Sequence, residues 1–155
     1  MNEVAAYHEA GHAVVGHVLK LGIEKATIIE SEGVAGQVDL ADAPDPDDEH
    51  LYRDYLRRRL ACTIGGPWAE ALYLEEEVEF TPFYFYGDDW EELIDDAAAL
   101  AGEDAEEQER VRDEAALKAH RILTENWSKV EAIAKALMQH GELSRVQLLP
   151  LLPQA

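Results

Sequence analysis

Residues His8–His12 read HEAGH, and this pentapeptide constrains the chain more than any other feature. On an α-helix, side chains four positions apart lie on one face, so His8 and His12 can converge on a single metal ion. Glu9 lies about 100° around such a helix from His8. Its carboxylate would stand beside the metal and could accept a proton from an attacking water molecule. The pattern predicts a zinc peptidase site in which His8 and His12 bind the metal and Glu9 is the catalytic base.

The residues around the motif favour the helix that this geometry needs. The stretch Val4–Lys20 contains no proline and several strong helix formers, with Asn2 placed to cap its start. Both histidines belong to an apolar stripe with three- and four-residue spacing, formed by Ala5, His8, His12, Val15 and Leu19. A buried histidine pair without metal is the alternative, but it would need hydrogen-bond partners for several polar atoms at once.

Length and composition predict one folded domain spanning residues 1–155. The chain is 47% hydrophobic, yet it has no uninterrupted apolar run of membrane-spanning length, and we expect no signal peptide before the first helix. Its one cysteine, Cys62, rules out an internal disulfide and lies in an apolar stretch, so we expect a structural role for it. We expect a cytoplasmic protein.

The formal net charge of −20 argues against nucleic acid and anionic membranes as partners. Acidic residues concentrate in two stretches, residues 30–50 and 75–114, which contain almost no lysine or arginine. A solvated, solubilising surface explains this most simply. A preference for basic substrates and adaptation to high salt remain open as alternatives.

The pattern of apolar residues and turn formers predicts a mostly α (α+β) fold: a helical zinc-peptidase domain carrying the HExxH helix and a small antiparallel β-sheet. Strands at Lys25–Glu30 and Val34–Leu40 would form a hairpin around Ser31–Gly33. A helix capped by Asp45 is expected from Pro46 to Ile64, with a stop at Gly65-Gly66 and a second helix from Pro67 to Leu74. A helix from Trp90 to Ala101 would follow a cap at Asp89. The last helices are expected from Asp104 to His140, with a break near Thr124–Asn126, and after a cap at Ser144.

A catalytic zinc usually takes three protein ligands, so a third must come from elsewhere in the chain. His17 is about 140° around the helix from His12 and should point away. The remaining histidines look like ordinary surface residues: His50, His120 and His140. Acidic candidates lie where an aromatic segment enters a helix, at Asp88 and Asp89, and on the helix after Gly-Gly-Pro, at Glu70. For Asp89, helix capping is an equally simple explanation, so the residues alone leave the ligand open.

Four segments, in this order, resemble the peptidase domain of the FtsH family of membrane-anchored AAA+ zinc proteases: AAYHEAGHAVVGHVL, ATIIESEGVAGQVDL, LACTIGGPWAEALYL and GDDWEELIDDAAALA. The resemblance runs from Val4 to about Leu152, and HEAGHA with GG-x-x-AE is its most specific part. It implies that Asp89 is the third zinc ligand, with Asp88 where the family usually has asparagine, and that Glu70 supports the ligands without touching the metal. It also implies a strand beside the zinc on which a substrate can lie, with the candidates Val34, Ala35, Gly36, Gln37 and Val38.

The chain departs from the family in three ways. The approach to Asp89 is aromatic (FTPFYFYG) where the family has small residues, Pro67 replaces an arginine, and no GxxxxGK[ST] motif or transmembrane segment is found. We therefore expect a zinc-dependent, ATP-independent endopeptidase for unfolded proteins or peptides, and a homo-oligomer would be compatible with this. A catalytically weak or inactive binding or regulatory protein with the same fold is the alternative. Tyr84 and Tyr86 are available as oxyanion stabilisers, although packing is the commoner role for such residues.

Overall fold

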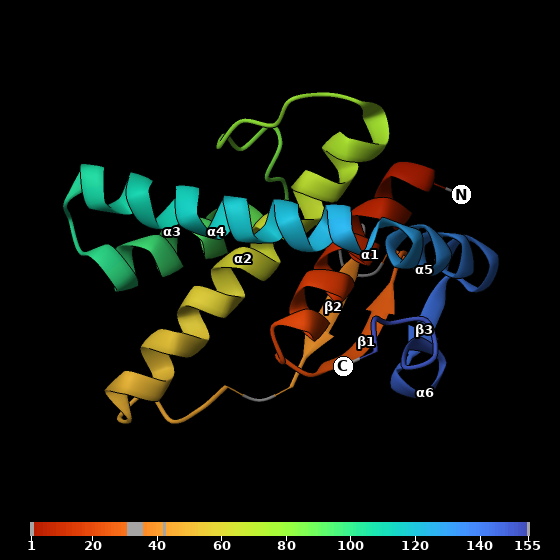
Figure 1. Ribbon diagram of the computed structural model, residues 1–155, viewed down its shortest axis with the longest axis horizontal. Coiled ribbons are helices and arrows are strands. Elements are labelled where there is room, and N and C mark those ends of the chain that lie inside the picture. Colours follow the sequence, from red (N-terminus) through yellow and green to blue (C-terminus); the bar gives the residue numbers. More distant parts are fainter. Residues whose placement is uncertain (1, 31–35, 42, 155) are drawn as a thin grey trace.

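The computed structural model describes residues 2–30, 36–41 and 43–154 and confirms a mostly helical fold with a small antiparallel sheet (Figure 1). In chain order the described elements are α1 (Glu3–Val18), β1 (Ile23–Thr27), β2 (Gln37–Leu40), α2 (Glu49–Leu74), α3 (Asp88–Ala101), α4 (Ala105–Glu125), α5 (Trp127–His140), β3 (Glu142–Ser144) and α6 (Arg145–Leu148).

Helix α1 is the centre of the molecule and carries the HEAGH motif. It packs against α2, α4, α5 and the first two strands, and its residues from Ala5 to Gly16 are all buried. The predicted cap is present, because the side chain of Asn2 accepts a hydrogen bond from the backbone N–H of Ala5 at 3.2 Å. Over this stretch the helix is therefore buried on every side and not along one stripe alone, and both motif histidines lie inside with it.

The sheet has the order β2-β1-β3, with antiparallel pairing on both sides of β1. The predicted hairpin is thus confirmed, but its strands are shorter than expected and β1 starts earlier, directly after the turn at Gly22. Of the predicted second strand, Val34 and Ala35 lie outside the described residues, as does the predicted turn. Strand β3 was not predicted. The described part of β2 forms one edge of the sheet.

The stop predicted at Gly65-Gly66 is wrong, because α2 continues through both glycines and through Pro67 to Leu74. The glycines serve close packing against α1 instead. A Cβ atom on Gly11 would lie 2.3 Å from the carbonyl oxygen of Gly65, and one on Gly66 would lie 2.3 Å from Nε2 of His12. Two helices can touch this closely only where side chains are absent, so the pair marks a helix crossing rather than a helix end.

Two predicted helix starts also need correction. Helix α2 begins at Glu49 rather than Pro46, because Asp48 rather than Asp45 caps it by accepting from the N–H of Leu51. Helix α3 begins at Asp88, after a glycine cap with no side-chain hydrogen bond, so the capping role considered for Asp89 is wrong. The break in the long C-terminal helical region is confirmed at Asn126, and Ser144 caps α6 as predicted.

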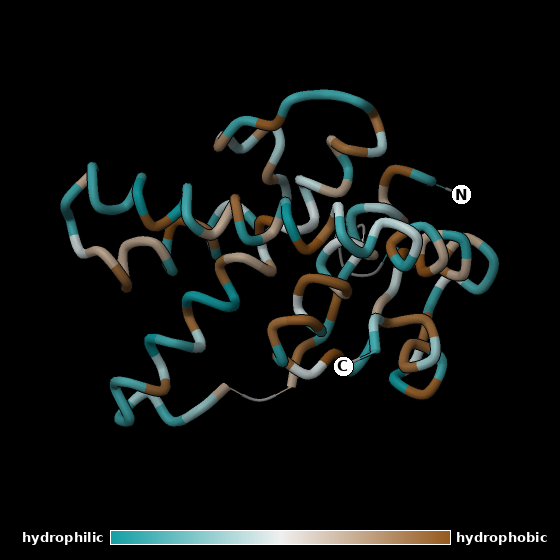
Figure 2. The backbone as a smooth tube through the Cα atoms, in the orientation of Figure 1, coloured by the Kyte–Doolittle hydropathy of each residue, from teal (hydrophilic) through white to brown (hydrophobic). Residues whose placement is uncertain are grey.

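Hydrophobic segments gather where the other helices meet α1, whereas the outer ends of α2 and α4 are hydrophilic (Figure 2). In the described part of the chain, every helix is too short or too polar to cross a bilayer. The described acids of the two acidic stretches are mostly exposed: those before α2 lie mainly in loops, and the later ones lie in the segment after α2 and on α3 and α4.

Candidate metal centre

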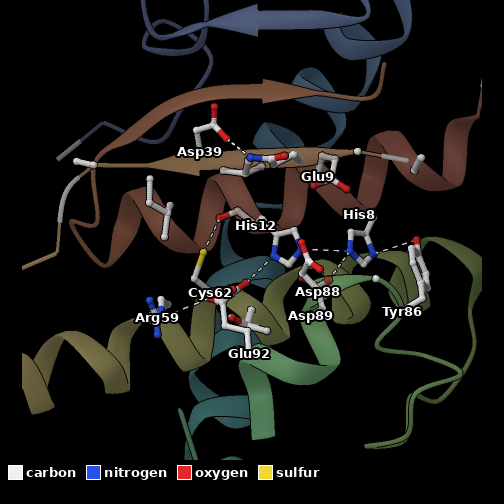
Figure 3. A pocket seen from close by; sticks show the side chains of 18 of the residues that line it. His8, Glu9, His12, Asp39, Arg59, Cys62, Tyr86, Asp88, Asp89 and Glu92 are labelled. Atoms are coloured by element: carbon white, nitrogen blue, oxygen red, sulfur yellow. Dashed lines mark hydrogen bonds and ion pairs between the residues drawn. The ribbon is translucent and has the colours of Figure 1, made fainter. Parts of the chain in front are cut away.

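Three potential metal ligands from two helices meet beside α1 (Figure 3). His8 and His12 project from successive turns of α1, and Asp89 projects from the first turn of α3. The Nε2 atoms of the two imidazoles are 3.1 Å apart, and Asp89 Oδ2 lies 2.8 Å from that of His8 and 3.1 Å from that of His12. The structure therefore brings together the three residues assigned as ligands from the sequence and the resemblance.

Hydrogen bonds on the far side of each imidazole fix which nitrogen faces the cluster. Nδ1 of His12 lies 2.8 Å from the backbone carbonyl oxygen of Cys62, which can only accept, so this nitrogen carries the proton. Nδ1 of His8 lies 3.2 Å from the hydroxyl of Tyr86, which itself donates to Glu70 at 2.7 Å. Both Nε2 lone pairs therefore point toward each other and toward Asp89.

This donor set fits a zinc ion. With both Nδ1 atoms protonated, the two Nε2 atoms and a carboxylate oxygen converge on one point, where a metal ion replaces any proton and satisfies all three. Two imidazoles and one carboxylate, with one position left for water, are a typical catalytic zinc set. In the part of the chain that the structure describes, this is the one group of three such side chains close enough to share an ion.

The electrostatics of the cluster also favour positive charge at this point. Burial opposes protonation of His12, yet attraction and a hydrogen bond from Asp89 raise the His12 pKa well above its usual value. Burial likewise opposes ionisation of Asp89, but His12 and His8 hold the pKa of this carboxyl well below its usual range. A carboxylate this strongly ionised beside two imidazoles is prepared to bind a dication.

A second set of contacts between α2 and α3 holds the helix that carries Asp89. Arg59 forms a bidentate ion pair with the buried carboxylate of Asp96, at 2.7 and 2.9 Å, and Thr63 donates to Glu92 at 3.1 Å. Burial raises the pKa of Glu92, while the Asp96 contact raises that of Arg59. This clamp between α2 and α3 was not predicted from the sequence. The sequence feature that could have predicted it is an acid within the apolar stripe of α3, Asp96 between Leu93 and Leu100.

Glu9 lines the same cavity as the three ligand candidates, a space of about 840 Å³ that also borders β2 and the start of α3. Its side chain is buried, and burial raises the Glu9 pKa against the opposing attraction of the two histidines. Gly36 packs directly on this carboxylate, because a Cβ atom there would lie 2.7 Å from Glu9 Oε2. Of the predicted substrate strand, Gly36, Gln37 and Val38 border the cavity.

The other candidate residues lie outside the ligand cluster. Glu70 is 3.8 Å from Nδ1 of His8, on the side away from the cluster, and Asp88 is exposed at the cavity rim. His17 lies 3.0 Å from the carbonyl oxygen of Pro153, facing the C-terminal segment. The three remaining histidines are exposed, as predicted: His50, His120 and His140. Cys62 is buried, and its thiol donates to the carbonyl of His12 in a structural contact.

Comparison with known proteins agrees with this geometry. The model of Peptidase family M41 matches residues 1–81, which include the HEAGH motif, the sheet edge and the glycine pair of α2. Residues 82–155, including Asp89, lie outside this match. The FtsH resemblance drawn from the sequence is confirmed at the level of the family.

Curated relatives match either about half of the chain or nearly all of it. The ATP-dependent zinc metalloprotease FtsH 2 of Salinibacter ruber is 42% identical over 79 residues, covering 47% of this chain and 11% of the relative. The protein of the same name from Sphaerobacter thermophilus is 45% identical over 71 residues, covering 44% and 11%. That from Thermoanaerobacter is 26% identical over 162 residues, covering 94% and 31%. The chain thus spans about a tenth to a third of the length of these relatives.

Proposed function

The chain belongs to Peptidase family M41, a family of zinc metalloproteases, and from this premise we propose that it is a zinc-dependent endopeptidase that cleaves unfolded proteins or peptides without ATP. The observation that carries the proposal is the convergence of His8, His12 and Asp89 with their lone pairs facing one point. Every residue needed to bind the metal and move the proton comes from this chain.

His8, His12 and Asp89 would hold the zinc ion through Nε2, Nε2 and a carboxylate oxygen. When bound, zinc supplies Lewis-acid chemistry, polarising the scissile carbonyl and making water a stronger nucleophile near neutral pH. Glu9 then acts as the general base. Its buried carboxylate, with a raised pKa, accepts a proton from the attacking water and delivers it to the leaving amine.

The cavity also indicates how a peptide would lie. Strand β2 borders the cavity and forms a sheet edge, so an extended substrate can add to it by backbone hydrogen bonds. Such binding requires an extended chain, which favours unfolded segments over folded domains. Several acids border the cavity, including Asp39, Asp88 and Glu92, and with the net charge of −20 they favour basic peptides over nucleic acid.

The test is cleavage of unfolded casein by the purified chain in the absence of ATP. We expect activity that a chelator abolishes and that added zinc restores. Glu9→Gln should retain zinc and lose activity by roughly 10²–10⁴-fold, because an amide cannot accept the proton. Zinc binding without cleavage by the wild-type chain would instead support a binding or regulatory protein with this fold.

A further inference from the structure

The hydroxyl of Tyr86 lies between a metal-ligand candidate and a carboxylate. It is 3.2 Å from Nδ1 of His8 and 2.7 Å from Oε1 of Glu70. The direct distance from His8 Nδ1 to Glu70 is 3.8 Å, which is too long for a hydrogen bond. Glu70 can therefore reach His8 only through the phenol.

The direction of these two hydrogen bonds follows from the number of protons. A phenol has one proton, and an ionised carboxylate can only accept, so the proton of Tyr86 lies toward Glu70. The oxygen of Tyr86 then offers a lone pair to His8. Nδ1 of His8 must supply the proton of that contact, so in the neutral imidazole, the form that binds a metal, the free lone pair is on Nε2, on the side of Asp89.

Stacking and chain geometry hold the same arrangement. The rings of Tyr86 and His8 are stacked, with centroids 4.9 Å apart and an interplanar angle of 28°. Gly87, at φ +63°, turns the chain between Tyr86 and α3, so that Asp89 meets the opposite nitrogen of the same imidazole. One short segment thus holds His8 by both of its ring nitrogens (Figure 3).

We propose that Tyr86 is a positioning residue for the metal site: it relays the charge of Glu70 to His8 and fixes the tautomer and orientation in which His8 binds zinc. Outer hydrogen bonds of this kind raise the basicity of a ligating imidazole and commonly account for roughly 10–100-fold of metal affinity. The aromatic segment before α3 therefore has a function beyond hydrophobic packing. Because its proton is directed to Glu70, Tyr86 is not free to stabilise an oxyanion.

The experiment measures zinc affinity by competition with a chromophoric chelator, so no substrate is needed. Tyr86→Phe removes the hydroxyl and keeps the stacking ring, and we expect affinity to fall roughly 10-fold or more. Tyr84→Phe is the matched control from the same segment, because Tyr84 packs against Phe83 rather than His8, and it should bind zinc as the wild type does.

Two further measurements separate a relay from a general structural effect. Glu70→Gln should weaken zinc binding by itself, and the double variant with Tyr86→Phe should be no weaker than the more affected single variant, since both changes break one chain of hydrogen bonds. In the zinc-loaded protein, the His8 Nδ1–H signal in nitrogen-15 NMR should shift in Tyr86→Phe and stay in place in Tyr84→Phe.

Wild-type affinity in Tyr86→Phe, or full additivity in the double variant, would overturn the relay. The proposal rests on zinc binding by His8, so the two can fail separately. Absence of zinc binding in the wild-type chain would overturn the proposed function, whereas tight wild-type binding with an unaffected Tyr86→Phe would overturn only the relay.

Discussion

Replacing Gly66 by alanine should damage the metal site from a position that contains no ligand. A Cβ atom at Gly66 would lie 2.3 Å from Nε2 of His12 and 2.5 Å from its Cε1, whereas ordinary van der Waals contact begins at 3.4 Å. The imidazole would have to move by about 1.1 Å. Metal ligands tolerate deviations of only about 0.2 Å, so His12 could not keep its place beside Asp89.

Gly66→Ala should change two quantities, the free energy of unfolding and the zinc affinity. Alanine gains about 1 kcal/mol over glycine within a helix, and overpacking costs about 1–3 kcal/mol, so the free energy of unfolding of the metal-free protein should fall by no more than about 2 kcal/mol. Zinc affinity should fall at least tenfold, which corresponds to about 1.4 kcal/mol. Thermal unfolding with chelator and zinc competition in the folded protein measure the two quantities.

Gly65→Ala is the matched control. This variant gains the same helix propensity and overpacks the same helix crossing as Gly66→Ala. Its Cβ atom, however, would meet Cγ2 of Val15 at 2.8 Å and not an imidazole. We expect it to lower stability while keeping zinc affinity within a few-fold of wild type. Wild-type zinc affinity in Gly66→Ala would refute displacement of His12 by the new Cβ atom. The same holds if both variants lose zinc affinity in proportion to their loss of stability.

Three further predictions address the clamp, the substrate and the sheet edge. Asp96→Ala should destabilise the protein by roughly 2–3 kcal/mol, which is below the range for a fully buried pair because Arg59 is partly exposed. Asp95 is exposed, so Asp95→Ala should change the midpoint of urea unfolding little. Equal midpoints for the two variants would contradict the clamp. Peptides with lysine or arginine near the scissile bond should have a lower KM than neutral ones, and this difference should shrink as the sodium chloride concentration is raised. If the ratio of the two KM values did not depend on salt, electrostatic selection would be excluded. Gly36→Ala should lower kcat with zinc content unchanged, because its Cβ atom displaces the Glu9 carboxylate; unchanged kcat would place Glu9 outside the reaction.

The ligand helix was predictable because its signals are local. Asn2 supplies the cap, the three- and four-residue spacing supplies the buried stripe, and the motif puts both histidines on it. The break at Asn126 and the cap at Ser144 were predictable for the same reason. Each of these features is decided by residues within a few positions of one another.

Features that depend on distant contacts were not predictable from the sequence. Gly65 and Gly66 have the local pattern of a helix end, but the approach of α1 decides their conformation. Strand β3 is only three residues long and exists because β1 offers it a free edge. Asp89 has the sequence of a helix cap, and its carboxylate turns away from the backbone because two imidazoles lie within 3.1 Å of it.

The supporting residues of the site were the hardest to find. Tyr86 reads as one member of an aromatic run, and nothing in its neighbours shows that its hydroxyl reaches Glu70, 16 positions earlier. Arg59 and Asp96, which join α2 to α3, are likewise 37 positions apart in the sequence. An acid or a phenol near a ligand can be predicted from composition, but its partner is set by tertiary packing.

The most direct test of the account is the zinc content of three purified variants after dialysis. The wild-type chain should hold about one zinc ion, and Asp89→Asn should lose most of it because a neutral amide replaces the one anionic ligand. Asp88→Asn should keep the zinc, and Glu70→Gln, which weakens binding without removing a ligand, should keep far more than Asp89→Asn. Asp89 makes no capping hydrogen bond, so loss of zinc from this variant would not reflect an unmade helix cap. Retention of zinc by Asp89→Asn together with its loss from Glu70→Gln would contradict the ligand set and move the third ligand to α2.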